Sequence, residues 1–115
     1  MDARNIAAPR RRNEPATAVV AAATLTVDDI KVETPSDAQS SACAAWPIWT
    51  CEPSEFPWYY DQNEQCLILE GEAIVTPDGG SESVTIGVGN LVTFPQGMGC
   101  TWKVTKAIKK HYNFY

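Results

Sequence analysis

The sequence predicts an all-β protein, a single barrel or sandwich of short strands that follows an N-terminal extension. The apolar runs are short, glycine- and proline-rich turns separate them, and none has the period of an amphipathic helix. All eleven aromatic residues (four Trp, four Tyr and three Phe) lie from residue 46 onward. At 115 residues, the chain has room for one such domain.

The extension, residues 1–43, is rich in Ala, Ser, Thr and Pro. A segment without large aromatic side chains contributes little to a core, so we expect the first 24 residues to be disordered. Residues 25–32 are expected to form a short strand on the barrel. The run Arg10-Arg11-Arg12 before the alanine-rich residues 18–23 leaves three interpretations open: a plain extension, an organelle import segment or a secretion signal.

The strands of the barrel are expected in the short apolar runs that follow. Glu70-Gly71-Glu72 is expected to be a turn, and residues 77–80 predict a hairpin because Asp-Gly and Gly-Gly accept positive φ angles. No helix longer than one turn is required. The clearest strands are predicted at residues 65–69, 73–76, 83–86, 91–94, 100–104 and 110–115.

The charges are unevenly distributed along the chain. Between Lys31 and Lys103 there is no positive residue, whereas ten of the fourteen acidic residues lie there. Lys103, Lys106, Lys109 and Lys110 then form a basic C-terminal edge, which we interpret as a solvent-exposed face. A net charge of −5 opposes nonspecific binding to nucleic acid, which needs a positive surface to neutralise phosphates. We therefore predict no direct nucleic-acid partner.

The four cysteines, Cys43, Cys51, Cys66 and Cys100, contain no C-x-x-C pair. A structural zinc site of the knuckle type is therefore not predicted. Their even number permits disulfides, but a chain of this length can stabilise itself by burying a core. We interpret the four as reduced thiols of an intracellular protein.

Two spacings in the later part of the chain resemble the signature motifs of the cupin superfamily, G-x5-H-x-H-x3,4-E-x6-G and G-x5-P-x-G-x2-H-x3-N. The matching positions are Glu64, Gly71, Gly89, Pro95, Gly97 and Cys100. From Trp46 to Tyr112 the chain resembles the small single-domain RmlC-like cupins related to ureidoglycine aminohydrolase. The resemblance covers about residues 44–115 and implies a cupin jelly-roll β-barrel, a double-stranded β-helix of six to eight strands. Because such cupins occur in plastids, it also implies a plastid or cytoplasmic location.

The resemblance implies a metal site from which three of the four ligands are missing. Glu64 keeps its carboxylate. The three histidine positions hold Trp58, Tyr60 and Cys100, or Pro57, Tyr59 and Cys100 if the gap before Glu64 is four residues. Indole, phenol and thiol are a poor set for manganese or iron. We therefore predict no metal and no other cofactor.

Alternation along the strands predicts which side chains line the barrel interior, because residues two apart share a face. The resemblance implies that four motif positions point inward, Trp58, Tyr60, Glu64 and Cys100, and alternation then adds Cys66 and Trp102 to the predicted pocket. Glu64 is its only charged member, and either a general acid/base role or a structural hydrogen bond, for instance from the Tyr60 hydroxyl, would suit it. A nucleophilic role for Cys100 needs a partner that stabilises the thiolate, and nothing in the sequence brings His111, the only histidine, to it.

Two functional hypotheses follow. The first is a small cupin that binds an organic ligand or serves as an assembly subunit, for example in a plastid complex, without metal catalysis. The alternative is an enzyme similar to ureidoglycine aminohydrolase, acting on a small nitrogenous or sugar-like metabolite with Glu64 as acid/base. The expected partners are a small molecule in the barrel and a larger assembly or a second copy of the chain. No apolar run is long enough to predict a membrane partner.

Overall fold

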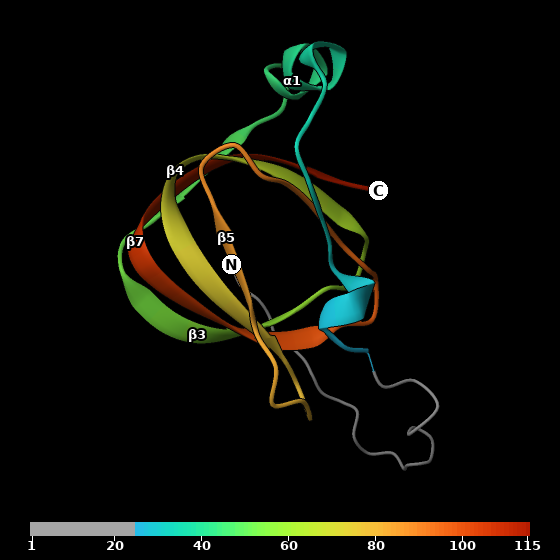
Figure 1. The fold of residues 1–115 in the computed structure, drawn as a ribbon, viewed down its shortest axis with the longest axis vertical. Coiled ribbons are helices and arrows are strands. Elements are labelled where there is room, and N and C mark those ends of the chain that lie inside the picture. Colours follow the sequence, from blue (N-terminus) through green and yellow to red (C-terminus); the bar gives the residue numbers. More distant parts are fainter. Residues whose placement is uncertain (1–24) are drawn as a thin grey trace.

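The computed structural model describes residues 25–115, and the predictions of disorder or targeting for residues 1–24 lie outside this range. Seven antiparallel strands form one sheet that curls into a barrel, as Figure 1 shows end-on. The all-β prediction is confirmed. The strands are β1 (Lys31–Glu33), β2 (Ile48–Cys51), β3 (Ser54–Tyr59), β4 (Glu64–Pro77), β5 (Val84–Gly87), β6 (Leu91–Phe94) and β7 (Gly99–Phe114).

The barrel is built around β4 and β7, which pair along almost their whole length, from Glu64 opposite Phe114 to Pro77 opposite Cys100. Each replaces two predicted strands. The expected turn around Gly71 is an irregularity within β4, where the register with β7 shifts but pairing continues. Gly71 has a φ of 91°, and a Cβ there would overlap the carbonyl oxygen of Ala107. Glycine therefore lets the strand bend without ending.

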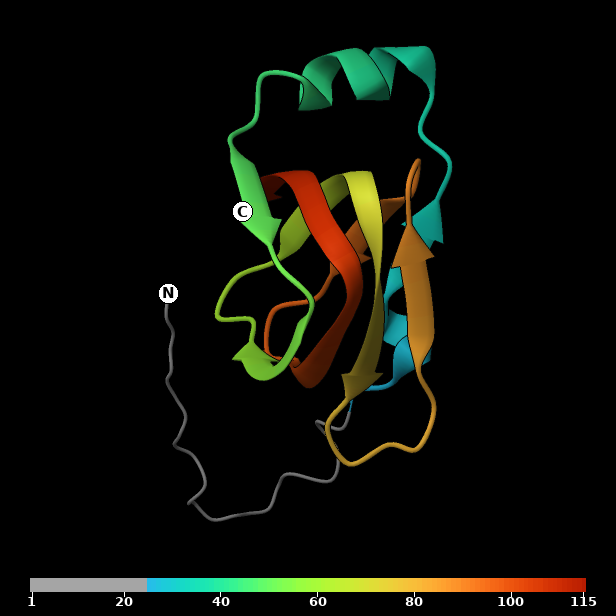
Figure 2. The ribbon, with the colours of Figure 1, turned by 90° about the vertical axis from the view of Figure 1, so that its left-hand side faces the viewer.

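Residues 25–43, predicted as part of the extension, contribute three short elements. The expected strand at residues 25–32 is a 3₁₀ turn (η3, Val27–Asp29) followed by β1, which pairs with β6. The prediction that no helix exceeds one turn is also corrected, because α1 (Asp37–Cys43) has seven residues. It lies across one end of the barrel (Figure 2).

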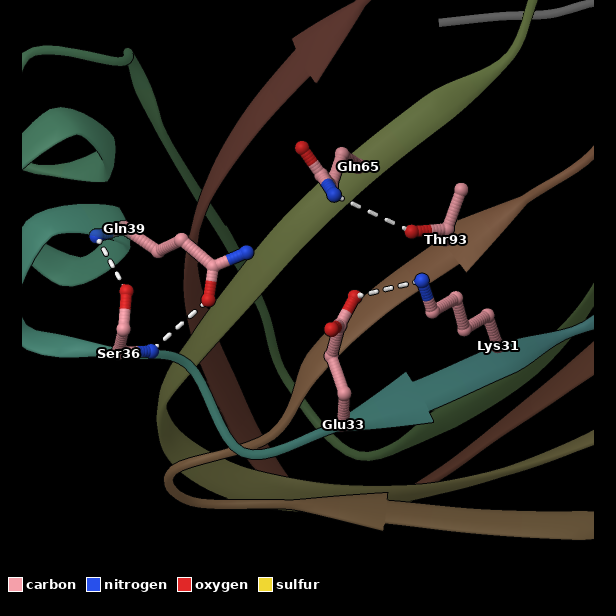
Figure 3. A network of polar contacts seen from close by, with 6 residues as sticks. All are labelled: Lys31, Glu33, Ser36, Gln39, Gln65 and Thr93. Atoms are coloured by element: carbon pink, nitrogen blue, oxygen red, sulfur yellow. Dashed lines mark hydrogen bonds and ion pairs between the residues drawn. The ribbon is translucent and has the colours of Figure 1, made fainter.

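Local side-chain bonds explain where α1 begins (Figure 3). Ser36 and Gln39 form a capping box. The backbone N–H of Gln39 donates to Ser36 Oγ, and the backbone N–H of Ser36 donates to Gln39 Oε1. Lys31 pairs with Glu33 within β1 at 3.7 Å. Within α1 only Cys43 is buried, so the helix has no apolar stripe that the hydrophobic pattern could reveal.

Two groups of buried side chains stabilise the fold. The smaller one, Cys43, Leu67 and Leu91, packs with Trp46 and Leu69 and connects α1 to the barrel wall. The larger one fills the barrel. It consists of Ile30, Tyr60, Cys66, Ile68, Ala73, Val75, Ile86, Val92, Phe94, Met98, Cys100, Trp102, Val104 and Ile108.

Candidate functional site

A cavity of about 140 Å³ lies among β2, β3, the start of β4 and β7. Its wall is mainly aromatic, with two charged side chains. The lining residues are Trp49, Phe56, Trp58, Tyr60, Glu64, Trp102, Lys110, Tyr112 and Phe114.

Strand register places the aromatic members of this wall. Phe56 on β3 lies opposite Trp102 on β7. Their rings are stacked, with centroids 6.4 Å apart and an interplanar angle of 13°. Trp49 on β2 lies opposite Lys110 on β7. Tyr60 follows β3 and is held by backbone bonds to the turn before β7, donating to the Met98 carbonyl at 2.9 Å. The wall is therefore assembled from segments that are far apart in the sequence.

Four of the six residues predicted to line a pocket do so: Trp58, Tyr60, Glu64 and Trp102. The other two, Cys66 and Cys100, are fully buried in the barrel core and are not on the cavity wall. Burial raises the pKa of Cys66 to about 12, and that of Cys100 also lies well above its ordinary value, chiefly because of burial. Both thiols are therefore protonated at neutral pH, which does not suit a nucleophile.

The sequence did not predict four aromatic residues of the wall, Trp49, Phe56, Tyr112 and Phe114. The most consequential residue that it missed is Lys110. It was assigned to a solvent-exposed basic edge, yet it is only 5% exposed, and Nζ donates to Oε2 of Glu64 at 2.9 Å. Inward side chains recur at even positions along β7, at Cys100, Trp102 and Ile108. Alternation continued past residue 104 would also have placed Lys106 inside, yet Lys106 is exposed where the register with β4 shifts, so the pattern alone does not single out Lys110.

Glu64 is thus not the only charged side chain inside, and it forms a buried ion pair. Nζ of Lys110 lies 4.9 Å from the ring centroid of Trp49 and 4.8 Å from that of Trp102, within cation–π range. Burial, the largest single influence, would lower the pKa of Lys110, but the charge and hydrogen bond of Glu64, together with Cys66 and Tyr112, raise this pKa on balance. The lysine is therefore a cation at neutral pH, and the pair has no net charge.

The bond expected from the Tyr60 hydroxyl to Glu64 is absent, since Lys110 is the donor. Among residues 25–115, Tyr60 Oη and Trp102 Nε1 are buried without a hydrogen-bond partner. Burial, followed by the charge of Glu64, raises the pKa of Tyr60 well above its ordinary value. The phenol is therefore neutral, and its ring stacks on Phe94 with centroids 4.8 Å apart.

These side chains do not fit the divalent metal that the cupin motifs would imply. The Trp58 indole offers no lone pair for coordination, the Cys100 thiol lies in the core away from the cavity wall, and the Glu64 carboxylate is neutralised by Lys110. Within the described part of the chain, no three His, Cys, Asp or Glu side chains are grouped as metal ligands would be. His111 is not on the cavity wall, and its Nδ1 lies 2.9 Å from the Trp46 carbonyl oxygen.

The barrel and its inward motif positions define the protein as a cupin. The model of the EutQ-like cupin domain matches residues 38–112, and the chain belongs to that family. The expected cupin barrel is thereby confirmed.

Solved structures agree with this assignment. A DUF861 family protein from Thermotoga maritima is 46% identical, with 75% of this chain and 99% of that chain covered and a TM-score of 0.71. A DUF861 family protein from Pseudomonas syringae is 28% identical over 59% of this chain and 29% of that chain (TM-score 0.53). The EutQ protein of Clostridium difficile, 16% identical over 86% of this chain and 80% of that chain (TM-score 0.54), shares the fold. No match was found among curated proteins.

No helix in residues 25–115 is long and apolar enough to cross a membrane.

Proposed function

We propose that this cupin binds a small organic ligand in its aromatic cavity without a protein-bound metal. The observation that carries the proposal is the wall itself, in which seven aromatic side chains surround one buried ion pair. Aromatic faces provide apolar contact and stacking, and a few polar groups set the orientation of a ligand. Glu64 and Lys110 are the groups placed to do so.

The size of the cavity supports a small ligand. Its volume of about 140 Å³ is close to that of engineered protein cavities of ~150 Å³ that admit benzene. Phe114 on this wall is 39% exposed, so part of the cavity wall lies at the protein surface.

Tryptophan fluorescence tests the proposal, because Trp49, Trp58 and Trp102 line the cavity whereas Trp46 packs against the other side of the wall. Titration with small aromatic and heteroaromatic compounds is expected to change the fluorescence saturably. The Trp58→Phe variant should reduce the response, and the matched control Trp46→Phe should preserve it. An equal response in the two variants would show that binding occurs elsewhere.

The catalytic alternative, a reaction like that of ureidoglycine aminohydrolase with Glu64 as acid/base, is favoured by one observation: the Glu64 carboxylate lies on the cavity wall. It predicts turnover of ureidoglycine or a related metabolite that is lost in Glu64→Gln. If purified protein shows no turnover above the Glu64→Gln variant, the catalytic proposal is wrong.

A role as an assembly subunit or homodimer, in a plastid or elsewhere, is proposed on different grounds. The two end strands of the main sheet path expose apolar side chains, Val32 on β1 and Ile48 on β2. Light scattering after size exclusion would test self-association, and a monomer at all concentrations would exclude the homodimer.

A further inference from the structure

The cavity is electrically neutral although it contains two ionised side chains. Lys110 and Glu64 cancel one another, and the pKa shift of Tyr60 keeps its phenol uncharged. The remaining lining residues are aromatic rings without charge. A charged ligand that entered the site would lose its hydration. No unpaired opposite charge on the wall would compensate for this desolvation free energy.

The place that suits a ligand cation is already filled. An aromatic pair that faces a carboxylate is a typical site for an ammonium group. Here Trp49 and Trp102 face Nζ of Lys110, and the same atom contacts Glu64. The protein supplies its own cation, so a ligand cation would have to displace it.

The ion pair retains hydrogen-bonding capacity. An ammonium group has three N–H donors and a carboxylate has two oxygens, and the bond between Lys110 and Glu64 uses one of each. A donor and an acceptor therefore stand next to one another on the wall of an aromatic cavity.

We propose that the ligand is an uncharged planar molecule whose edge carries an adjacent acceptor and donor, as in an amide or a lactam. Its carbonyl oxygen accepts from Lys110, its N–H donates to Glu64, and its ring lies against the aromatic wall. This inference rests on the proposed ligand-binding function and specifies its ligand class.

Three probes of nearly equal shape separate the charge classes: benzamide is neutral, benzoate is an anion and benzamidinium is a cation at neutral pH. Titration of the full chain, followed by NMR of the tryptophan indole N–H signals, is expected to show the tightest binding for benzamide. Each ion should bind at least about tenfold more weakly, a difference of ~1.4 kcal/mol.

Variants that leave one charge unpaired should invert this preference. Glu64→Gln leaves the Lys110 cation and should favour benzoate over benzamide, whereas Lys110→Met leaves the Glu64 anion and should favour benzamidinium. Lys109→Met is the matched control, because Lys109 lies on the same strand in an exposed pair with Glu70 at 3.9 Å. It should keep the wild-type order.

The outcomes distinguish this inference from the proposed function. If benzoate or benzamidinium binds to the wild type as tightly as benzamide, the ligand class is wrong and ligand binding stands. If none of the three probes shifts the indole signals at millimolar concentration, both proposals fail. If a cavity variant does not fold, the relative affinities of the three probes for the wild type test the ligand class by themselves.

Discussion

Replacing Lys110 with Met would test whether the buried ion pair supports the barrel. Met keeps an unbranched chain but removes the ammonium, so the Glu64 carboxylate, in a residue only 2% exposed, would lose its partner. Removing one member of a buried pair costs about 3–5 kcal/mol, because a charge is then left unpaired in the interior. Since domains of this size have stabilities of about 5–15 kcal/mol, the loss is a large fraction of the total.

Urea denaturation of four proteins measures the effect: wild type, Lys110→Met, Glu64→Met and the double variant. Each single change is expected to reduce the free energy of unfolding by about 3–5 kcal/mol. The double variant should lose much less than the sum, because it leaves no unpaired charge. Lys109→Met, which removes an exposed partner of Glu70, should cost under about 1 kcal/mol.

A loss below about 1 kcal/mol in Lys110→Met, or a double variant as unstable as the sum of the two single changes, would refute the pairing.

The pH dependence of stability provides an independent check. Because the pKa of Lys110 is raised in the folded protein, its contribution is complete below the ordinary value of 10.5 and is lost as the pH rises through the higher, folded value. The part of the stability difference between wild type and Lys110→Met that the Lys110 ammonium supplies should thus be lost in alkali.

Three further outcomes are expected. Elemental analysis of protein purified without chelator should find no stoichiometric manganese, iron or nickel, and a content near one per chain would contradict the assignment of the site. Gly71→Ala should destabilise the fold by more than about 1 kcal/mol, whereas Gly79→Ala, with φ 80° but no atom within 4 Å of its Cβ, should cost less in thermal denaturation. Alkylation at pH 8 should modify the partly exposed Cys51 in the native protein and Cys66 only after denaturation, because burial raises the pKa of Cys66 to about 12; rapid native labelling of Cys66 would show that the barrel is open.

The sequence determined the barrel and three of the seven aromatic side chains of the cavity wall, Trp58, Tyr60 and Trp102. The resemblance to the cupin motifs implied that Trp58 and Glu64 face the interior. Alternation, a property of a single strand, then added Trp102, which lies two residues after the motif position Cys100. The motif spacing from Gly89 to Gly97 likewise depends on short turns that adjacent residues specify. Gly97, with a φ of 93°, occupies such a turn, beside the backbone of Tyr60.

Only the tertiary structure decided what Glu64 contacts. Its partner Lys110 is 46 residues away, and the two meet because the beginning of β4 pairs with the end of β7, from Glu64 opposite Phe114 to Ile68 opposite Lys110. A lysine among other lysines near the end of a chain is usually solvent-exposed, and local sequence does not contain the carboxylate that reverses this preference. The buried ammonium group of Lys110 needs an opposite charge, and here a distant strand supplies it. The ion pair between Glu64 and Lys110 therefore depends on the register between β4 and β7 and not on the sequence of either strand.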